Sequence, residues 1–335
     1  MRFGVFDHMD RAQPDLGRQY ADRLELLRAY DDGGMHGYHM AEHHGTPLGL
    51  APSPALFIAA AAQRTERLRL GALVFTLPQY HPLRLAEEIC MLDHLTGGRL
   101  ELGIGRGISP IELGFFGLTP EEAAARFAES RDVLLAALTS ESLTFHGAYY
   151  DFDDVPMELR PVQRPHPPLW YGVSRLDTLD WAAPASVNCV MNLPAAQARE
   201  FVDAYRGRWV ALDRDPAAMP LLGVSRHVVV ADSDREALAL AERAYPQWRA
   251  SLLHLWERHG MIAPYIGYPP SAREAIEQDY LYAGSPASVG AQAARLEQET
   301  GISYLLCRFA FGELPLDAAL HSVALFTGEV MPALA

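Results

Sequence analysis

The feature that most constrains the fold of this chain is an alternation of short apolar runs with longer segments of helical periodicity. The apolar runs have the continuous hydrophobic character of strands that are buried on both faces of a parallel sheet. Eight such runs are predicted: Arg2–Phe6, His36–Ala41, Leu68–Leu73, Arg99–Ile104, Leu169–Val173, Val187–Met191, Leu221–Ala231 and Ile302–Phe309. Because a helical segment follows each of them, the sequence predicts an α/β fold, a (β/α)8 TIM barrel.

The helical segments carry recognisable start and stop signals. Thr119-Pro120 combines an N-cap with a proline at the first helical position, and Gly33-Gly34 ends the first helix. The predicted helices are Asp15–Tyr30, Pro54–Arg64, Pro82–Leu95, Thr119–Leu138, Asp177–Ala183, Ala195–Leu212, Ser233–His259, one that begins at Ser285, and Leu314–Met331.

One connection is much longer than the others. Met261–Ala283 is rich in Pro, Gly and Tyr, and a connection of this length is usually functional or mobile. We therefore predict a single domain over residues 1–335, with a long insertion after strand seven in which residues 260–284 form a mobile active-site lid.

Composition excludes several classes of function. The net charge of −14 disfavours a nucleic-acid partner, because an acidic surface repels phosphodiesters. There is no apolar run of about 18 residues, so no membrane-spanning helix is expected. Acid and histidine side chains follow too soon after Met1 for a signal peptide. Cys90, Cys189 and Cys307 lack metal-ligand spacing and are interpreted as reduced core thiols of a cytoplasmic protein.

The most informative side chains stand where two predicted strands end. Ala41-Glu-His-His44 places an acid and two imidazoles after the second strand, and Leu102–Gly107 places an arginine among three glycines after the fourth. Both positions are carboxyl ends of strands, where TIM barrels build their active sites. Together they suggest an enzyme that binds a phosphorylated cofactor and performs proton or oxygen chemistry beside it.

The glycine-rich segment Gly103–Gly107 allows three interpretations. Its glycines would let the backbone approach a ligand, and Arg106 can bind a phosphate or stack on a planar ring. A plain tight turn is the second interpretation. A Rossmann fingerprint is the third, although Ile108 stands where its last glycine should be and no helix is expected immediately afterwards.

The histidine segment is also open to a zinc interpretation. His39-Met-Ala-Glu-His43 matches a zinc motif that functions on a helix. The run is short and strand-like, and on a strand His39 and His43 are too far apart for one ion. A structural role at the barrel mouth and a role facing a cofactor are the other interpretations, and we expect no metal site.

A third segment, Ser174–Thr178, ends a strand and opens a helix. Hydroxyls and free backbone amides at a helix start can bind an anion, and a plain N-cap is the alternative interpretation.

Taken in order, these segments resemble the bacterial-luciferase-like family of flavin-dependent monooxygenases. The resemblance runs nearly from end to end. It rests on Ala41–His44, Leu77–Arg84, Met91–Gly107, Arg160–Trp170, Gly284-Ser285-Pro286, Leu325-Phe326 and Val330-Met331-Pro332.

The resemblance implies an FMN-binding barrel that is usually a dimer. His43 aligns with the active-site histidine beside the reactive edge of the flavin, and Arg106 aligns with the arginine that contacts the flavin phosphate. Leu73–Val74 aligns with a non-proline cis peptide beneath the isoalloxazine. The remaining cofactor-binding positions are Gly105, Ser174 and Thr178, with Arg175 as an addition.

The chain departs from the light-emitting subunit of luciferase. That subunit has a cysteine in place of Gly105, an acid in place of Val173 and an aromatic residue in place of Gly45, and the segment after Ser174 is one residue longer here. These departures argue against light emission but not against flavin binding.

The resemblance implies a monooxygenase that uses reduced FMN and dioxygen to oxygenate a small organic substrate. No second nucleotide fingerprint is present, which favours reduced flavin supplied by a separate reductase. A deazaflavin-dependent hydride-transfer enzyme on the same barrel and a non-catalytic flavin-binding or partner subunit are the alternatives.

Overall fold

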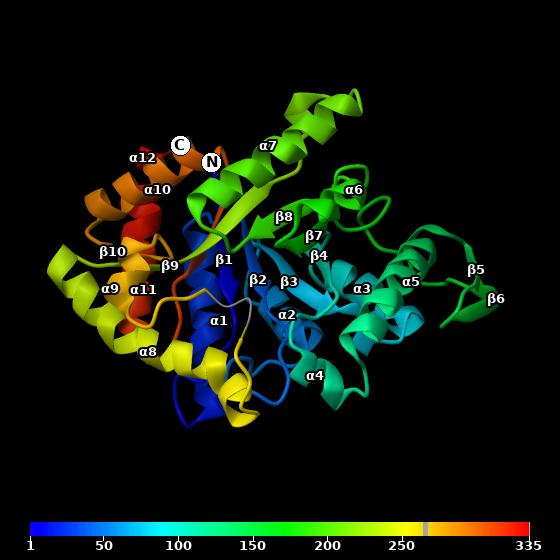
Figure 1. Cartoon of the computed structure of the whole chain (residues 1–335), viewed down its shortest axis with the longest axis horizontal. Helices are drawn as coiled ribbons and strands as arrows, with labels where there is room; N and C mark the ends of the chain where they lie inside the picture. Colours follow the sequence, from blue (N-terminus) through cyan, green and yellow to red (C-terminus); the bar gives the residue numbers. More distant parts are fainter. Residues whose placement is uncertain (264–266, 335) are drawn as a thin grey trace.

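Eight parallel strands close into a barrel in the computed structural model, which describes residues 1–263 and 267–334 (Figure 1). Around the barrel they are β1 (Arg2–Asp7), β2 (Gly37–Met40), β3 (Arg69–Thr76), β4 (Leu100–Gly105), β7 (Leu169–Val173), β8 (Asn188–Met191), β9 (Leu222–Val230) and β11 (Tyr304–Arg308). The pairing of β8 with β9 completes the ring. The predicted barrel is confirmed, and all eight predicted strands are present.

Helices cover the outside of this barrel (Figure 1). The longer ones are α1 (Leu16–Asp32), α2 (Pro54–Ala62), α3 (Pro82–Leu95), α5 (Pro120–Thr139), α7 (Ala195–Ala211), α8 (Asp234–Arg258), α10 (Pro286–Thr300) and α11 (Leu316–Leu325). The predicted start of α5 is formed by a full capping box, in which Thr119 and Glu122 each accept a hydrogen bond from the backbone N–H of the other. Among the described residues, no helix is both long and apolar enough to cross a membrane.

Two additions to the barrel were not predicted. Between α5 and β7, β5 (Ser142–His146) and β6 (Asp151–Pro156) form an antiparallel hairpin at the edge of the molecule (Figure 1). The short helix α4 (Pro110–Phe115) begins three residues after Gly107, so no helix starts immediately after the glycines. The hairpin is largely exposed and therefore lacks the apolar pattern that marks the barrel strands.

The insertion after the seventh barrel strand is more regular than predicted. Within residues 260–284, α9 (Ala272–Glu277) is a helix, and β10 (Leu281–Gly284) extends the sheet beside β9. Parts of the segment thus have regular secondary structure, while the prediction that residues 260–284 form a mobile active-site loop stays a prediction. Residues 264–266 of that predicted loop lie outside the described residues.

The interior of the barrel is filled below its mouth. Leu73, Trp170, Val190, Tyr304 and Leu306 pack together from different strands. The indole of Trp170 donates to Glu101, which also pairs with Arg69, so the buried carboxylate is satisfied. This layer of side chains makes the inside of the barrel a packed core at this level.

Candidate active site

A cavity of about 630 Å³ opens at the carboxyl ends of the barrel strands. Its wall is contributed by residues at the ends of β1, β2, β3, β4, β7 and β8 and by the turns that follow them. All the residues that the sequence placed at a site line it: His43, Leu73, Val74, Gly105, Arg106, Ser174, Arg175 and Thr178. The structure thus brings together segments that are up to 135 residues apart in the chain.

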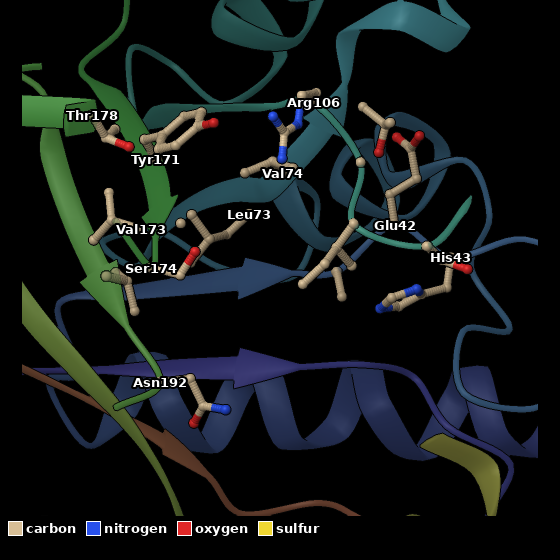
Figure 2. Close-up of a pocket in the computed structure, with 18 of the residues that line it drawn as sticks. Glu42, His43, Leu73, Val74, Arg106, Tyr171, Val173, Ser174, Thr178 and Asn192 are labelled. Atoms are coloured by element: carbon tan, nitrogen blue, oxygen red, sulfur yellow. The ribbon is translucent and has the colours of Figure 1, made fainter. Parts of the chain in front are cut away.

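Figure 2 shows how these side chains are distributed. Leu73 and Val74 lie between two groups of polar side chains. His43 and Glu42 stand on one side, and Ser174 and Thr178 on the other, with Arg106 above Val74 in this view. The cavity is therefore polar at both ends and apolar in the middle.

The peptide bond between Leu73 and Val74 is cis, as the resemblance implied. It lies within β3, where the register with β4 shifts between Ala72 and Phe75. Val74 occupies the space beside Gly105, since a Cβ added to Gly105 would lie 2.2 Å from Cγ2 of Val74. The sequence suggested that this glycine lets a ligand approach, but the structure shows that it makes room for Val74.

We expect Gly105→Ala to displace Val74 and to distort the middle of the cavity. Val74 is β-branched and stiff, so the clash has to be relieved by the backbone. A destabilisation of about 1–3 kcal/mol should appear in urea unfolding. Gly114→Ala is the control, because a Cβ there meets no atom within 4 Å; equal effects of the two substitutions would contradict this account.

Arg106 is exposed in the turn after β4 and forms no ion pair with any described residue. An arginine that is not engaged by a carboxylate keeps its fork of donors for a ligand. Ser174 and Thr178 add hydroxyl groups to the cavity wall across from it (Figure 2).

Arg175 lines the same cavity but already has a carboxylate partner. Its Nη2 lies 2.6 Å from Oδ2 of Asp177, and its Nε also donates to this carboxylate. The segment beyond it is also less regular than the predicted helix Asp177–Ala183, because a 3-10 turn (Leu176–Thr178) precedes the four-residue helix α6 (Leu179–Ala182). The charge of Arg175 is thus compensated within the protein.

His43 forms a hydrogen-bonded pair with Glu112. Nδ1 of His43 lies 3.2 Å from Oε1 of Glu112, and the backbone N–H of His44 donates to Oε2 at 2.8 Å. Burial alone lowers the pKa of His43, but the charge and the hydrogen bond of Glu112 outweigh it, so that the pKa is raised above 6.5. The Glu112 carboxylate contacts Nδ1 of His43, so the other ring nitrogen, Nε2, is not used in this pair.

Glu112 was not found from the sequence, although a signal was present. Ser109-Pro110-Ile111-Glu112 is a helix start with glutamate at the third helical position, like the start of α5. Ser109 caps the helix by accepting from the backbone N–H of Glu112. The Glu112 side chain, however, turns to His43, and the reciprocal half of the capping box is not among the hydrogen bonds of the described residues.

We expect Glu112→Gln to move the titration of His43 to lower pH. Without the carboxylate, burial dominates and the pKa of His43 should fall from above 6.5 to below it. Because the folded-state pKa in the native protein exceeds the unfolded one, the pair stabilises the fold fully below pH of about 6.5 and this contribution is lost as pH rises through the folded pKa. Titration of the His43 ring by NMR, and urea unfolding between pH 5 and 9, measure both effects. An unchanged midpoint in the variant would contradict the pairing.

The other histidines of the motif have separate environments. Nε2 of His44 contacts Glu42, whose carboxylate also accepts from the hydroxyl of Tyr80. His39 is fully buried in the barrel and contacts the hydroxyl of Tyr304 at 3.0 Å. Over the described parts of the chain, no group of three or more His, Cys, Asp or Glu side chains is arranged to hold a metal ion.

Sequence reasoning also missed Asn192, which follows β8 and lines the cavity, and Tyr171, which lines it from β7 (Figure 2). Neither residue carries a sequence signal of its own, because each is placed there by the position of its strand in the barrel.

A family model described as "luciferase-like monooxygenase" matches residues 1–304 of the chain. The chain belongs to this family. The resemblance that the motifs suggested is therefore confirmed, and the protein is an oxidoreductase.

Among its relatives, the uncharacterised protein y4wF of Sinorhizobium fredii is 42% identical over 99% of this chain and 96% of its own. The oxygenase component of the flavin-dependent trigonelline monooxygenase of Acinetobacter baylyi is 31% identical over 72% of this chain and 68% of its own. The crystal structure of monooxygenase RslO1 from Streptomyces bottropensis superimposes with a TM-score of 0.90 over the whole of both chains, at 25% identity.

Two more distant solved structures share the fold with this luciferase-like chain. The oxygenating constituent of 3,6-diketocamphane monooxygenase from Pseudomonas putida, in complex with FMN, gives a TM-score of 0.84 at 22% identity, covering 99% of this chain and 98% of its own. The coenzyme F420-dependent tetrahydromethanopterin reductase of Methanopyrus kandleri gives 0.74 at 18% identity, covering 100% and 99%.

Proposed function

We propose that this protein is the oxygenase component of a two-component, FMN-dependent monooxygenase. It binds reduced FMN and uses dioxygen to oxygenate a small organic substrate, and a separate reductase supplies the reduced flavin. The observation that carries the proposal is the layout of the cavity, with the His43–Glu112 pair on one side, the hydroxyls of Ser174 and Thr178 on the other, and Arg106 above the apolar pair Leu73–Val74 between them.

The donor set fits a flavin mononucleotide. Arg106 is the cation for the phosphate, because it forms no ion pair with a carboxylate among the described residues. Ser174 and Thr178 add neutral donors on the cavity wall across from it. Leu73 and Val74 present an apolar surface to a planar ring. Gly105 contributes by making room for Val74, and Arg175 supports the phosphate end while it stays paired with Asp177.

Reduced FMN supplies the electrons for dioxygen activation when it is bound. The protein's own contribution is proton control at His43. Glu112 orients the ring through Nδ1 and favours the protonated form, so that Nε2 can hold a proton near neutral pH and deliver it into the cavity. The apolar middle of the cavity keeps water from the reacting atoms.

Several finer features belong to the same proposal. The name of the A. baylyi relative, an oxygenase component, supports a separate reductase as partner. Family resemblance supports a cytoplasmic homodimer that acts as a single domain. The length of residues 260–284 supports a segment that closes over the site and excludes water during turnover.

Anaerobic titration with reduced FMN, followed by stopped-flow mixing with oxygenated buffer, tests the proposal. We expect tight binding and a transient near-ultraviolet absorbance that decays to the spectrum of oxidised FMN. Binding of deazaflavin in preference to reduced FMN would instead favour the hydride-transfer enzyme. Oxidation of bound flavin at the rate of free flavin would favour a non-catalytic subunit.

A further inference from the structure

Arg308 is a buried arginine that has no anionic partner. It ends β11 and its residue is only 4% exposed. Two of its three guanidinium nitrogens, Nε and Nη1, are buried without a hydrogen-bond partner, and no ion pair of the described residues includes it. A buried cation in this condition is costly unless something that binds to the protein compensates it.

The other two buried arginines of the described chain are compensated. Arg23 lies 3.0 Å from the carboxylate of Asp7. Arg226 donates to the carbonyl oxygens of Ser225 and Leu193 and is 4.0 Å from Asp279. Arg308 alone among the three lacks both a carboxylate and a backbone carbonyl, and its polar partner in the chain is the neutral side chain of Tyr268, so its charge is not balanced by an anion.

The side chains packed on Arg308 are aromatic. Its guanidinium lies 5.1 Å from the ring centre of Phe6, 5.7 Å from that of Tyr268 and 6.0 Å from that of Trp248. Burial, and then the charge of Arg308, hold the pKa values of His8 and His227 well below the ordinary value, so both rings are neutral near pH 7. Arg226 is the other positive charge that acts on Arg308 and lowers its pKa, and unlike Arg308 it has carbonyl partners and lies 4.0 Å from Asp279.

The side chain stands at the mouth of the barrel, next to the cavity. Tyr304 and Leu306 of β11 pack inside the barrel, and strand alternation directs Arg308 to the same side, one level nearer the mouth. Phe6 connects the two, since it lines the cavity and its ring also packs against the guanidinium of Arg308. His8, in the same region, stacks on His43 with ring centres 5.9 Å apart.

Arg308 and Arg106 belong to opposite walls of the barrel. In the strand order, β11 is four strands from β4 in either direction around the ring, and Arg106 directly follows β4. Two arginines without an ion-pair partner among the described residues therefore stand on opposite walls, and His43 and Glu112 line the cavity next to Arg106.

We propose that Arg308 binds a carboxylate group of the organic substrate, which makes the substrate class an organic acid with an aromatic or otherwise apolar body. This inference rests on the proposed function, because it assigns the end of the cavity opposite the cofactor phosphate. The rings of Phe6, Trp248 and Tyr268 enclose the apolar part next to the anionic group, and the acid is then anchored with its body extending toward His43.

A carboxylate fits this region better than a phosphate. Its single charge matches the single guanidinium, and its planar geometry matches the donor fork. A phosphate needs further donors, and the neighbouring groups are aromatic rings and neutral imidazoles. The exposed Arg106, with Ser174 and Thr178, is the better phosphate site.

The test uses benzoate and its neutral counterpart benzamide, titrated calorimetrically into the full-length protein with and without oxidised FMN. We expect benzoate to bind at least roughly tenfold more tightly than benzamide and to raise the Tm. Arg308→Met should weaken benzoate binding by roughly 30-fold or more, and Arg308→Lys by less, because lysine keeps the charge but not the fork. Arg84→Met is the control for loss of a positive charge, since Arg84 is exposed and paired with Glu88.

Stability separates a ligand site from a structural arginine. Without benzoate, Arg308→Met should keep or raise the Tm, because it removes an uncompensated buried charge. A fall in Tm, or equal binding of benzoate and benzamide to the unmodified protein, overturns the proposal. Loss of benzoate binding in Arg106→Met rather than in Arg308→Met also overturns it, since the anion would then occupy the phosphate end. FMN affinity, measured separately, should be unchanged in Arg308→Met. If the native protein does not bind FMN, the proposed cofactor is wrong, whereas the comparison of benzoate with benzamide still tests the carboxylate site.

Discussion

Replacement of His43 by alanine is expected to lower the rate of substrate oxygenation by about 10²–10⁴-fold, the usual contribution of a positioned acid–base group. His43 is the titratable ring at the cavity wall whose protonated form is favoured near neutral pH, through its contact with Glu112 at 3.2 Å. Single-turnover reactions of the reduced-FMN complex with ¹⁸O₂ measure oxygen incorporation into product. The lifetime of the transient near-ultraviolet absorbance gives a second readout that needs no substrate.

The matched control is His44→Ala. His44 is the adjacent imidazole, but it does not line the cavity and its ring contacts Glu42 and Phe116. We expect His44→Ala to keep most of the activity and both variants to bind reduced FMN as the native protein does. Added imidazole should partly restore the activity of His43→Ala, which a purely structural role for His43 does not predict. Native rates in His43→Ala would exclude the proton-transfer role.

Replacement of Arg106 by methionine is expected to raise the Kd for FMN by roughly 10- to 100-fold, because a charged hydrogen bond to the phosphate is worth about 1.5–3 kcal/mol. The guanidinium of Arg106 has no ion-pair partner among the described residues, so it can bind the phosphate without breaking an ion pair within the protein. Fluorescence titration with FMN measures the change. Riboflavin, which lacks the phosphate, should bind the native protein and the variant equally.

Arg175→Met is the control for this second prediction. Arg175 lines the same cavity but is exposed and paired with Asp177, and exposed pairs contribute little. We expect its loss to change FMN affinity by less than about threefold. If riboflavin affinity falls as much as FMN affinity in Arg106→Met, the arginine supports the ring or the fold instead of the phosphate.

The barrel could be predicted from the sequence because its strands are buried on both faces. Such strands appear as continuous apolar runs, and the helices between them carry caps such as Thr119 and Ser233. The strand β10 could not be predicted in this way, because Leu281–Gly284 is only four residues long. It is held by its pairing with the C-terminal half of β9, from His227 to Val230. The hairpin β5–β6 has few buried residues and therefore no periodic signal.

The sequence by itself determined the barrel, the strand ends that carry His43 and Arg106, and the family to which the chain belongs, because these depend on local periodicity and on motifs of contiguous residues. The tertiary structure alone decided the partners of these residues. Glu112 is 69 residues from His43 along the chain, Asp177 already compensates Arg175, and Arg308 is left without an anion in the part of the chain that the structure describes. The His43–Glu112 contact arises when segments distant in sequence are placed around one ring, so no local pattern of residues encodes it, whereas Arg175 and Asp177 are neighbours whose pairing depends on the conformation of the turn.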